Sequence, residues 1–282
     1  MHVKLANVNG RGAIVTEQGT LDIAEATQGR IGPDLPSCIA AIDELVRLAP
    51  SLTGEIAPID ESLLGPPSSN PGQIIAIGMN YRAHAAEMGL VLSSIPAAFA
   101  KFRSALAGPF GPITLPSTEV DHEVEMVLVI GKTTAAVTPE NAWEFVAGIT
   151  CGQDLSERVV QMAAGRQFAL GKSYPGFAPI GPWMTTIDEF DDPNDIALGC
   201  SVDGDTKQDA RTSDMVFRVP ELLTALCEVI TLEPGDLIFT GSPSGAGSSH
   251  QPPRYLKAGQ ELVTWLEGVG TMRHSLVAAD KS

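Results

Sequence analysis

The sequence predicts a strand-rich α+β protein in which a small N-terminal unit precedes a larger β-rich domain. The 282 residues are 44% hydrophobic and include 28 glycines and 21 prolines, which is typical of a globular protein with many turns rather than of a helical bundle. Short runs rich in β-branched residues are bounded by Gly, Asn and Pro. A segment rich in Pro, Gly and Ser at residues 64–72 separates the two parts.

Residues 1–70 are expected to form the small α/β domain and its linker. Apolar runs at residues 3–8 and 13–16 predict strands, and Asn9 with Gly10 between them predicts a turn. Apolar residues at helical spacing over residues 39–49 predict a helix with Ser37 as its N-cap. The Pro and Gly residues of segment 64–72 support neither a helix nor a sheet ladder. We therefore expect residues 71–282 to form the second domain.

The second domain is expected to combine short strands with a few helices. Alternating or β-branched apolar runs predict strands at residues 74–77, 126–130, 237–240, 262–266 and 271–277. Helices are expected at residues 79–89, which Gly89 would end, at residues 138–146, where Pro139 follows Thr138, and at residues 220–230. Asp203 with Gly204 predicts a hairpin turn. Residues 99–102 and 108–115 are expected to be an irregular connection.

Two carboxylates stand at the start of the most apolar of these strands. Residues 121–125 read DHEVE and lead directly into the run MVLVIG. Side chains alternate along a strand, so Glu123 and Glu125 are expected on the same face. Two part-buried carboxylates so close repel each other unless a cation neutralises them or one takes a proton. The pattern therefore indicates either a site for a hard divalent cation or an ordinary solvated strand entrance.

Three further segments carry chemistry and have ordinary alternatives. His84 and Glu87 are three residues apart on a predicted helix, so they could activate water or be a surface pair. Asp154 has Glu157 three residues later, so it could cap a helix or supply a third oxygen ligand. Lys172 lies among apolar residues and glycines, where it could meet an anion in a pocket or reach solvent.

Charge and cysteine content exclude several classes of protein. The formal net charge is −16 and the sequence pI is about 4.6, which argues against nucleic acid or an anionic membrane as partners. The four cysteines have no metal-binding or redox spacing, so we expect reduced thiols in a cytoplasmic protein. No window approaches the about 18 apolar residues that a spanning helix needs.

Taken in order, these segments resemble the fumarylacetoacetate hydrolase (FAH) family. The resemblance covers about residues 72–278 and rests on six segments, none of which is specific alone. The six segments are residues 77–87 (IGMNYRAHAAE), 121–132 (DHEVEMVLVIGK), 154–161 (DLSERVVQ), 171–173 with 181–183 (GKS and GPW), 234–236 (PGD) and 240–245 (TGSPSG). The fold that the resemblance implies is a mixed β-sandwich roll with a small N-terminal domain, usually as a homodimer.

The resemblance also implies a role for each matching residue. Glu123, Glu125 and Asp154 match the family's metal ligands, usually for Mg²⁺ and sometimes for Mn²⁺ or Ca²⁺. All-carboxylate ligation is what a hard cation selects. His84 and Glu87 match a water-activating pair on a lid segment, and Lys172 matches a pocket lysine. The resemblance assigns the following residues to substrate binding: Tyr81, Arg158, Gln161, Thr240 and Ser242.

Some positions depart from the family's pattern. Gln153 stands where Asn is common, Asp203 where Asn-Gly is usual, and Ser242 where Thr is more frequent, while Gly259 and Gln260 replace Gly-Asp. None of these changes removes a ligand or the water-activating pair, so they bear on the choice of substrate.

The implied function is metal-dependent hydrolysis of a C–C bond in a β-diketo acid, such as an acylpyruvate or a compound like fumarylacetoacetate. A small 2-oxo acid from aromatic or sugar acid catabolism is the expected partner. One alternative uses the same site as an oxaloacetate decarboxylase or as an isomerase or tautomerase of an unsaturated oxo-diacid. The other is a non-enzymatic Ca²⁺-binding or scaffold protein. His84 with Glu87 favours hydrolysis, because only hydrolysis needs an activated water.

Overall fold

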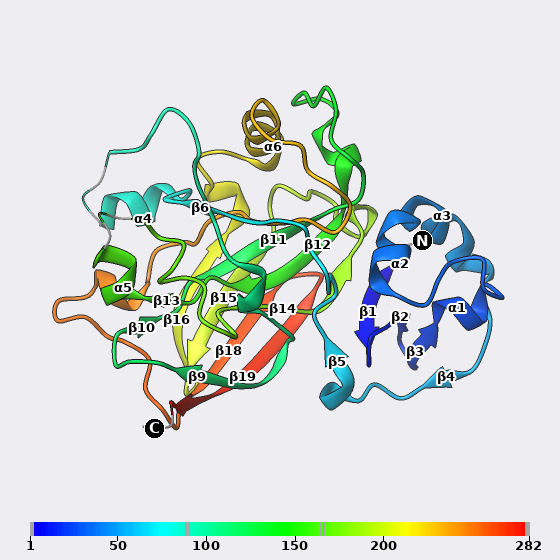
Figure 1. Ribbon diagram of the computed structural model, residues 1–282, viewed down its shortest axis with the longest axis horizontal. Coiled ribbons are helices and arrows are strands. Elements are labelled where there is room, and N and C mark those ends of the chain that lie inside the picture. The colour runs from blue at the N-terminus through cyan, green and yellow to red at the C-terminus, as the bar shows by residue number, and fades with distance from the viewer. Residues whose placement is uncertain (1–2, 88, 90, 164, 166, 280–282) are drawn as a thin grey trace.

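The computed structural model describes residues 3–87, 89, 91–163, 165 and 167–279. Two packed sheets form the main body, and the N-terminal strands and helices lie to one side of it (Figure 1). This architecture confirms the strand-rich α+β fold that the sequence predicts. Among the described residues, no helix is long and apolar enough to cross a membrane.

The larger sheet runs through both parts of the chain. Its strands follow the order β4, β3, β2, β1, β14, β12, β11, β17, β6, β7, and β5 and β8 pair beside β1 and β14. Their bounds are β1 Lys4–Val8, β2 Arg11–Thr16, β3 Gly19–Asp22, β4 Ile56–Ala57, β5 Leu64–Gly65, β6 Ile74–Gly78, β7 Ala97–Ala100, β8 Leu106–Ala107, β11 Val124–Ile130, β12 Val146–Gln153, β14 Ala178–Thr185 and β17 Leu237–Phe239. The antiparallel pairing of β1 with β14 joins the N-terminal strands to the main body.

The smaller sheet packs across the larger one and encloses the core. Its order is β16, β15, β18, β19, β9, with bounds β9 Phe110–Leu115, β15 Ala197–Val202, β16 Asp205–Arg211, β18 Glu261–Leu266 and β19 Gly270–Ala278. Strand β12 contacts β18, and β14 contacts β19. The buried side chains of both sheets, such as Met126, Ile149, Leu262 and Met272, fill the space between them. A separate ladder joins β10 (Val120–Asp121) to β13 (Ser156–Glu157).

Short helices cover the edges of the sheets. The α-helices are α1 Ile23–Ala26, α2 Leu35–Ala40, α3 Ile42–Leu48, α4 Arg82–Glu87, α5 Arg158–Ala163 and α6 Val219–Cys227. The 3₁₀ turns are η1 Ala49–Ser51, η2 Glu61–Leu63, η3 Arg103–Ala105, η4 Ala142–Phe145, η5 Ile187–Glu189, η6 Thr212–Asp214 and η7 Gly247–Ser249. Helices α4 and α5 lie at the same end of the main body, at the left in Figure 1.

The structure corrects the predicted N-terminal helix and linker. The helix is broken at Ala41 into α2 and α3, and its N-cap is Asp34, whose carboxylate accepts from the backbone N–H and the hydroxyl of Ser37. Pro36 sits in the first turn, where it needs no N–H donor, so the helix starts before Ser37. Within the linker, β5 pairs with β1, so Leu64 and Gly65 do support a short ladder.

Three other local predictions are wrong for the same physical reason, since pairing with distant strands overrides local pattern. Residues 97–100 form β7, which pairs with β6, and residues 110–115 form β9, which pairs with β19. Only η4 forms within residues 138–146, because Val146 already begins β12. The hairpin turn at Asp203 and Gly204 is confirmed, since both have positive φ angles of 52° and 83°.

Candidate functional site

Three carboxylates meet where the β11–β12 hairpin leaves the core. In the register of this hairpin Glu125 pairs with Gly152, and the N–H of Asp154 donates to the carbonyl of Glu123 over 2.8 Å. Oxygens of Glu123, Glu125 and Asp154 lie within 4.8 Å of one another, and all three residues are buried. Asp154 directly follows the end of β12 and caps no helix, because α5 begins only at Arg158. A group of oxygen ligands alone is the kind that a hard cation selects.

Two buried lysines accompany the carboxylates. The Nζ atom of Lys172 lies 2.7 Å from Oε2 of Glu123 and also donates to Asp154. Lys101 donates to Asp154 and to the backbone carbonyl of Lys172. Sequence reasoning missed Lys101 as a site residue. The available signal was a lysine inside the otherwise apolar run of residues 97–102.

The charges of this cluster fit an additional cation. The carboxylates in contact here are Asp121, Glu123, Glu125 and Asp154, and their cations are Lys101, Lys172 and Arg158. Even with both lysines protonated, four carboxylates exceed three cations by one negative charge. Burial, with the nearby Asp154 carboxylate, raises the pKa of Glu125 well above its ordinary value. Burial opposes ionisation of Glu123 as well, but Lys172 and Arg158 hold its pKa far below the ordinary value. Glu125 is therefore the carboxylate that lacks a compensating cation, as expected of a metal ligand in the absence of metal.

The glycine-rich loop after β17 fixes the Glu125 side chain. The N–H of Gly241 donates to Oε2 of Glu125 over 2.7 Å. Gly241 has a φ of +104°, and a Cβ there would lie 2.5 Å from the Cβ of Asn80, so a glycine is needed at this close approach. Asn80 in turn donates to the carbonyl of Thr240 over 2.7 Å.

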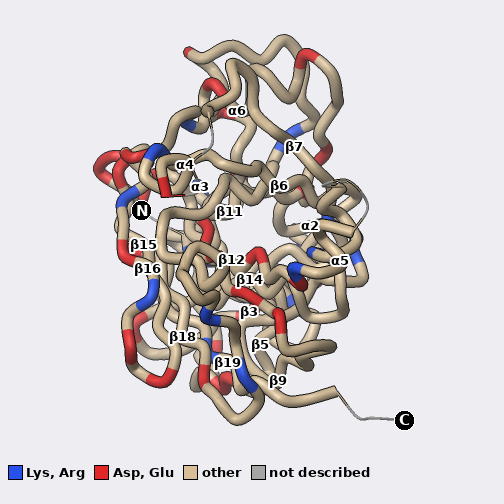
Figure 2. Tube along the Cα trace, turned by 90° about the vertical axis from the view of Figure 1, so that its left-hand side faces the viewer, with Lys and Arg blue, Asp and Glu red and all other residues tan. Residues whose placement is uncertain are grey.

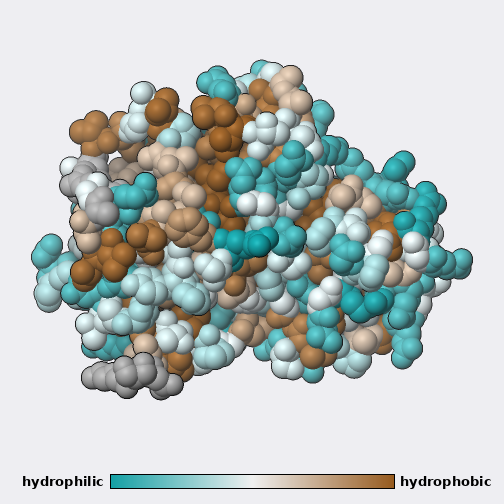
Figure 3. All heavy atoms as spheres, in the orientation of Figure 1, coloured by the Kyte–Doolittle hydropathy of each residue, from teal (hydrophilic) through white to brown (hydrophobic). Residues whose placement is uncertain are grey.

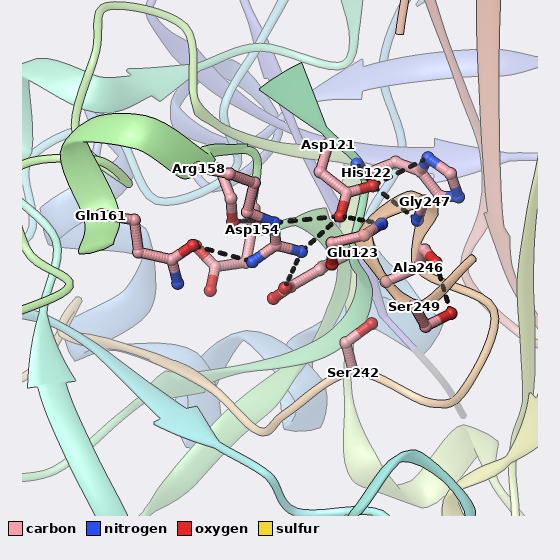
Figure 4. Close-up of polar contacts among 12 residues, drawn as sticks. Asp121, His122, Glu123, Asp154, Arg158, Gln161, Ser242, Ala246, Gly247 and Ser249 are labelled. Atoms are coloured by element: carbon pink, nitrogen blue, oxygen red, sulfur yellow. Dashed lines mark hydrogen bonds and ion pairs between the residues drawn. The ribbon is translucent and has the colours of Figure 1, made fainter. Parts of the chain in front are cut away.

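Arg158 is held by the protein's own acidic groups (Figure 4). Its guanidinium donates to Asp121 Oδ2 over 2.5 and 3.0 Å, to Glu123 Oε1 over 2.7 Å and to Gln161 Oε1 over 2.9 Å. Asp121 also accepts from the N–H groups of Gly247 and Ser248. Asp121 therefore ties α5 to the loop that carries η7, a role that the sequence did not reveal.

His84 and Glu87 form a pair on α4. The Nδ1 atom of His84 lies 3.3 Å from Oε2 of Glu87, which also accepts from the N–H of Gly245 over 3.2 Å. Burial opposes ionisation of Glu87, but hydrogen bonds from Ser249, Gly245 and His84 keep its pKa below the ordinary value. An ionised Glu87 favours the tautomer with the proton on Nδ1, which leaves Nε2 able to accept a proton.

One pocket is lined by members of each of these groups, with Glu123 representing the carboxylate cluster and His84 the pair on α4. It has a volume of about 360 Å³, which lies at the lower end of the volumes usual for small-molecule sites. Its polar lining residues are His84, Glu123, Arg158, Gln161, Lys172, Ser242 and Ser248, and its apolar and aromatic ones include Ile77, Met79, Phe99, Met162, Phe168 and Tyr255. Apolar side chains also gather on the surface at the left of Figure 3, over the end of the molecule where α4 and α5 lie. The pocket therefore has a charged floor and a largely apolar wall.

Two of the proposed substrate-binding residues lie behind the pocket wall. Tyr81 is 1% exposed, its hydroxyl has no partner among the described residues, and it does not line the pocket. Thr240 donates its hydroxyl to the carbonyl of Met126 over 2.8 Å. Ser242 does line the pocket, and its Oγ accepts from Nε2 of Gln208 over 2.8 Å, which leaves the hydroxyl proton free to donate.

Gln153, one of the positions that depart from the family's pattern, holds Glu123 in place by hydrogen bonding. Its Oε1 accepts from the N–H of Glu123 over 2.8 Å, while its Nε2 donates to Thr264 of the smaller sheet over 3.1 Å. The longer side chain at this position therefore ties the first carboxylate to β18.

Comparison with known proteins agrees with this site. Residues 73–277 match the family model described as fumarylacetoacetate (FAA) hydrolase C-terminal. The chain is 36% identical over 279 residues to a mitochondrial oxaloacetate tautomerase FAHD2A of Bos taurus, covering 98% of this chain and 87% of the relative. It is 41% identical over 219 residues to a 2,4-didehydro-3-deoxy-L-rhamnonate hydrolase of Sphingomonas sp. (strain SKA58), covering 77% of each.

A solved structure extends the comparison to bound ligands. The maleylpyruvate hydrolase of Sphingobium sp. SYK-6, solved with a manganese(II) ion and pyruvate, superposes with a TM-score of 0.79. It shares 32% sequence identity and covers 98% of this chain and 100% of its own. These relatives are enzymes that act on small acids, and the match to the family model spans most of the sequence. This chain belongs to the fumarylacetoacetate hydrolase family.

Proposed function

We propose that this protein is a divalent-cation-dependent hydrolase that cleaves the C–C bond of a β-diketo acid of the acylpyruvate or fumarylacetoacetate type. The observation that carries the proposal is that His84 lines the same pocket as Glu123, which belongs to the carboxylate cluster, and Lys172. Hydrolysis needs a group that accepts a proton from water and a second group that stabilises the departing enolate. The two halves of the pocket can supply one each.

Glu123, Glu125 and Asp154 are the residues that would hold the cation, which we propose to be Mg²⁺ or Mn²⁺. When bound there, the cation supplies electrostatic stabilisation of negative charge on the oxygens of a 2-oxo acid. Lys172 adds positive charge on the same side of the pocket. Although burial favours its neutral amine, Asp154 and Glu123 raise the pKa of Lys172, so it remains an ammonium group.

His84 would act as the general base. Glu87 holds Nδ1–H, so Nε2 takes a proton from a water molecule, and the resulting hydroxide adds to the acyl carbonyl remote from the carboxylate. The C–C bond then breaks and its electron pair passes to the carbon that becomes the pyruvate enolate. Proton return to that carbon gives pyruvate, and the acyl group leaves as a carboxylic acid.

Ser242 and Gln161 are the residues that we propose to bind the substrate directly, and Arg158 places Gln161. The Arg158 guanidinium already donates to Asp121 and Glu123, so its main role here is to fix the end of α5. Tyr81 and Thr240 are proposed to affect substrate binding indirectly. Tyr81 would fix the position of α4, and Thr240 that of the loop after β17.

A second candidate function is tautomerisation of oxaloacetate. It is favoured by the bovine relative, which aligns with 98% of this chain and bears that name. Decarboxylation of oxaloacetate or isomerisation of an unsaturated oxo-diacid would use the same charged floor. The test is product analysis with acetylpyruvate, fumarylpyruvate and oxaloacetate, each supplied with Mg²⁺ or Mn²⁺. Cleavage of acetylpyruvate or fumarylpyruvate to pyruvate and a carboxylic acid at the highest kcat/KM supports hydrolysis. Faster enol–keto conversion of oxaloacetate without cleavage assigns the second function, and faster release of carbon dioxide from oxaloacetate assigns decarboxylation.

We further propose the division into residues 1–70 and 71–282, a homodimer, and a cytoplasmic place in the catabolism of aromatic or sugar acids. The buried, unpaired cysteines Cys38, Cys151 and Cys200 support a reducing compartment. Limited proteolysis, light scattering and localisation of a tagged chain test these three statements.

A further inference from the structure

A second pocket lies next to the catalytic pocket, on the other side of Tyr255. It has a volume of about 300 Å³, and Tyr255 lines both pockets. Its basic lining residues come from three separate segments of the chain: His122, Lys207, His250, Arg254 and Lys257. None of the residues that line it in the described part of the chain is an Asp or a Glu.

This composition is unusual for this protein. The chain has 18 Lys and Arg against 34 Asp and Glu, and acidic segments predominate along the outer loops in Figure 2. A pocket that gathers three of those cations and two imidazoles without a carboxylate therefore departs from the charge of the whole molecule. Such a local excess of positive charge attracts anions even on an acidic protein.

The nearby acidic residues do not neutralise the pocket. Asp121 is already engaged by Arg158 and by two backbone N–H groups. Asp205 lies 3.7 Å from Lys207, but its side chain is 85% exposed, so this pair is largely in solvent. The side chains of Arg254 and Lys257 make no hydrogen bond or ion pair with another residue in the described ranges. Their charges are available to a ligand.

His122 provides an independent sign of a ligand. Its residue is only 3% exposed, and neither ring nitrogen has a hydrogen-bond partner in the described part of the molecule. Nδ1 lies 3.6 Å from Oδ1 of Asp121, beyond hydrogen-bond distance, so Nε2 is the ring nitrogen that lacks any polar neighbour of this kind. The imidazole contributes to the pocket lining beside the loop that carries Gly247 (Figure 4). Buried polar atoms without partners are rare because their desolvation is uncompensated. An oxyanion in the pocket would supply the missing acceptor.

We propose that this pocket binds a small oxyanion, with His122 at its base and Lys207, Arg254 and Lys257 around it. Phosphate and carboxylate groups share the required chemistry, because both accept several charge-assisted hydrogen bonds. The ligand is either inorganic phosphate or the anionic group of a small metabolite. Because Gly247 both lines this pocket and holds Asp121, the occupant contacts the loop that positions Arg158.

Calorimetric titration of the full chain in the presence of Mg²⁺ tests the proposal. Inorganic phosphate and succinate, each titrated separately, distinguish a phosphate from a carboxylate ligand. The double variant R254Q/K257Q removes two donors that nothing else in the described chain engages, so we expect the tighter anion to lose at least about tenfold in affinity. The matched control is R47Q/K132Q, which removes the same charge near Asp43, far from this pocket in the sequence.

A third variant separates this pocket from the catalytic one. Glu125→Gln alters the carboxylate cluster and should leave anion affinity within about twofold of the parent. Saturable binding that falls only in R254Q/K257Q supports the proposal. It is overturned if neither anion binds saturably, if binding falls equally in R47Q/K132Q, or if it falls in Glu125→Gln alone, which would place the anion at the catalytic cluster.

Discussion

Lys101 donates a hydrogen bond to the backbone carbonyl of Lys172, and both ammonium groups donate to the carboxylate of Asp154. Lys101, which directly follows β7, thereby fixes the position of a lysine that lies 71 residues further along the chain. Lys101 does not line the pocket, so it acts on the reaction by positioning Lys172 and Asp154.

We expect the substitution Lys101→Met to weaken both stability and turnover. It leaves a buried carboxylate oxygen and a carbonyl without their donor, which costs roughly 1–3 kcal/mol for each unsatisfied group. Thermal unfolding should show a lower Tm in metal-free protein and partial recovery with Mn²⁺, because the cation replaces the lost positive charge. The matched control Lys132→Met removes an exposed lysine and should change neither the Tm nor kcat. Equal Tm and kcat for Lys101→Met and the parent would show that Lys101 holds nothing in place.

Glu123 and Glu125 should respond in opposite ways to neutralisation. Glu123→Gln breaks the buried ion pairs with Lys172 and Arg158, and we expect it to destabilise metal-free protein by about 3–5 kcal/mol. Glu125→Gln removes a carboxylate that burial and Asp154 already disfavour, so metal-free stability should stay the same or rise. Both variants should lose Mn²⁺ affinity and turnover. Equal destabilisation by the two variants in denaturant melts would contradict this charge distribution.

The His84–Glu87 pair should matter for hydrolysis and little for binding. His84→Ala should lower kcat for acylpyruvate cleavage by roughly 10²–10⁴-fold, the usual share of general-base catalysis. The affinity for oxalate, which mimics the 2-oxo acid end, should change less than about threefold, because the carboxylate cluster and Lys172 are intact. Glu87→Gln keeps the shape of the pair and should show a smaller loss of kcat. Hydrolysis at the parental rate in His84→Ala would show that the His84–Glu87 pair is a surface contact without a role in catalysis.

The parts that could be predicted from the sequence are those that local pattern determines. Alternation along a strand was sufficient to put Glu123 and Glu125 on one face, and the motifs of the FAH family pointed to Asp154. Lys101 was missed because its partners lie 53 and 71 residues away and become neighbours only when β7 joins the sheet. Asp121 was missed as a positioning residue for a similar reason. Its partners Arg158 and Gly247 come from two distant segments, and no local spacing signals that meeting.

Local signals also failed where a neighbour competed for the same role. Ser37 has a side chain suited to an N-cap, but Asp34 three residues earlier accepts from both its N–H and its hydroxyl. Thr138 followed by Pro139 is a good helix start, but from Val146 onward the chain pairs with β11 as strand β12. Pairing between separate strands decided both the fold around residue 146 and the location of Lys101.

The source of the new oxygen atom tests most directly whether this pocket hydrolyses its substrate. Cleavage that uses a water activated by His84 must add one solvent oxygen to the acyl product, whereas tautomerisation and decarboxylation add none. We predict that acetylpyruvate turned over in ¹⁸O-water gives pyruvate and acetate, with one heavy oxygen per acetate at the first turnover by mass spectrometry. Conversion of oxaloacetate with a higher kcat/KM, together with no labelled acetate, would contradict the account.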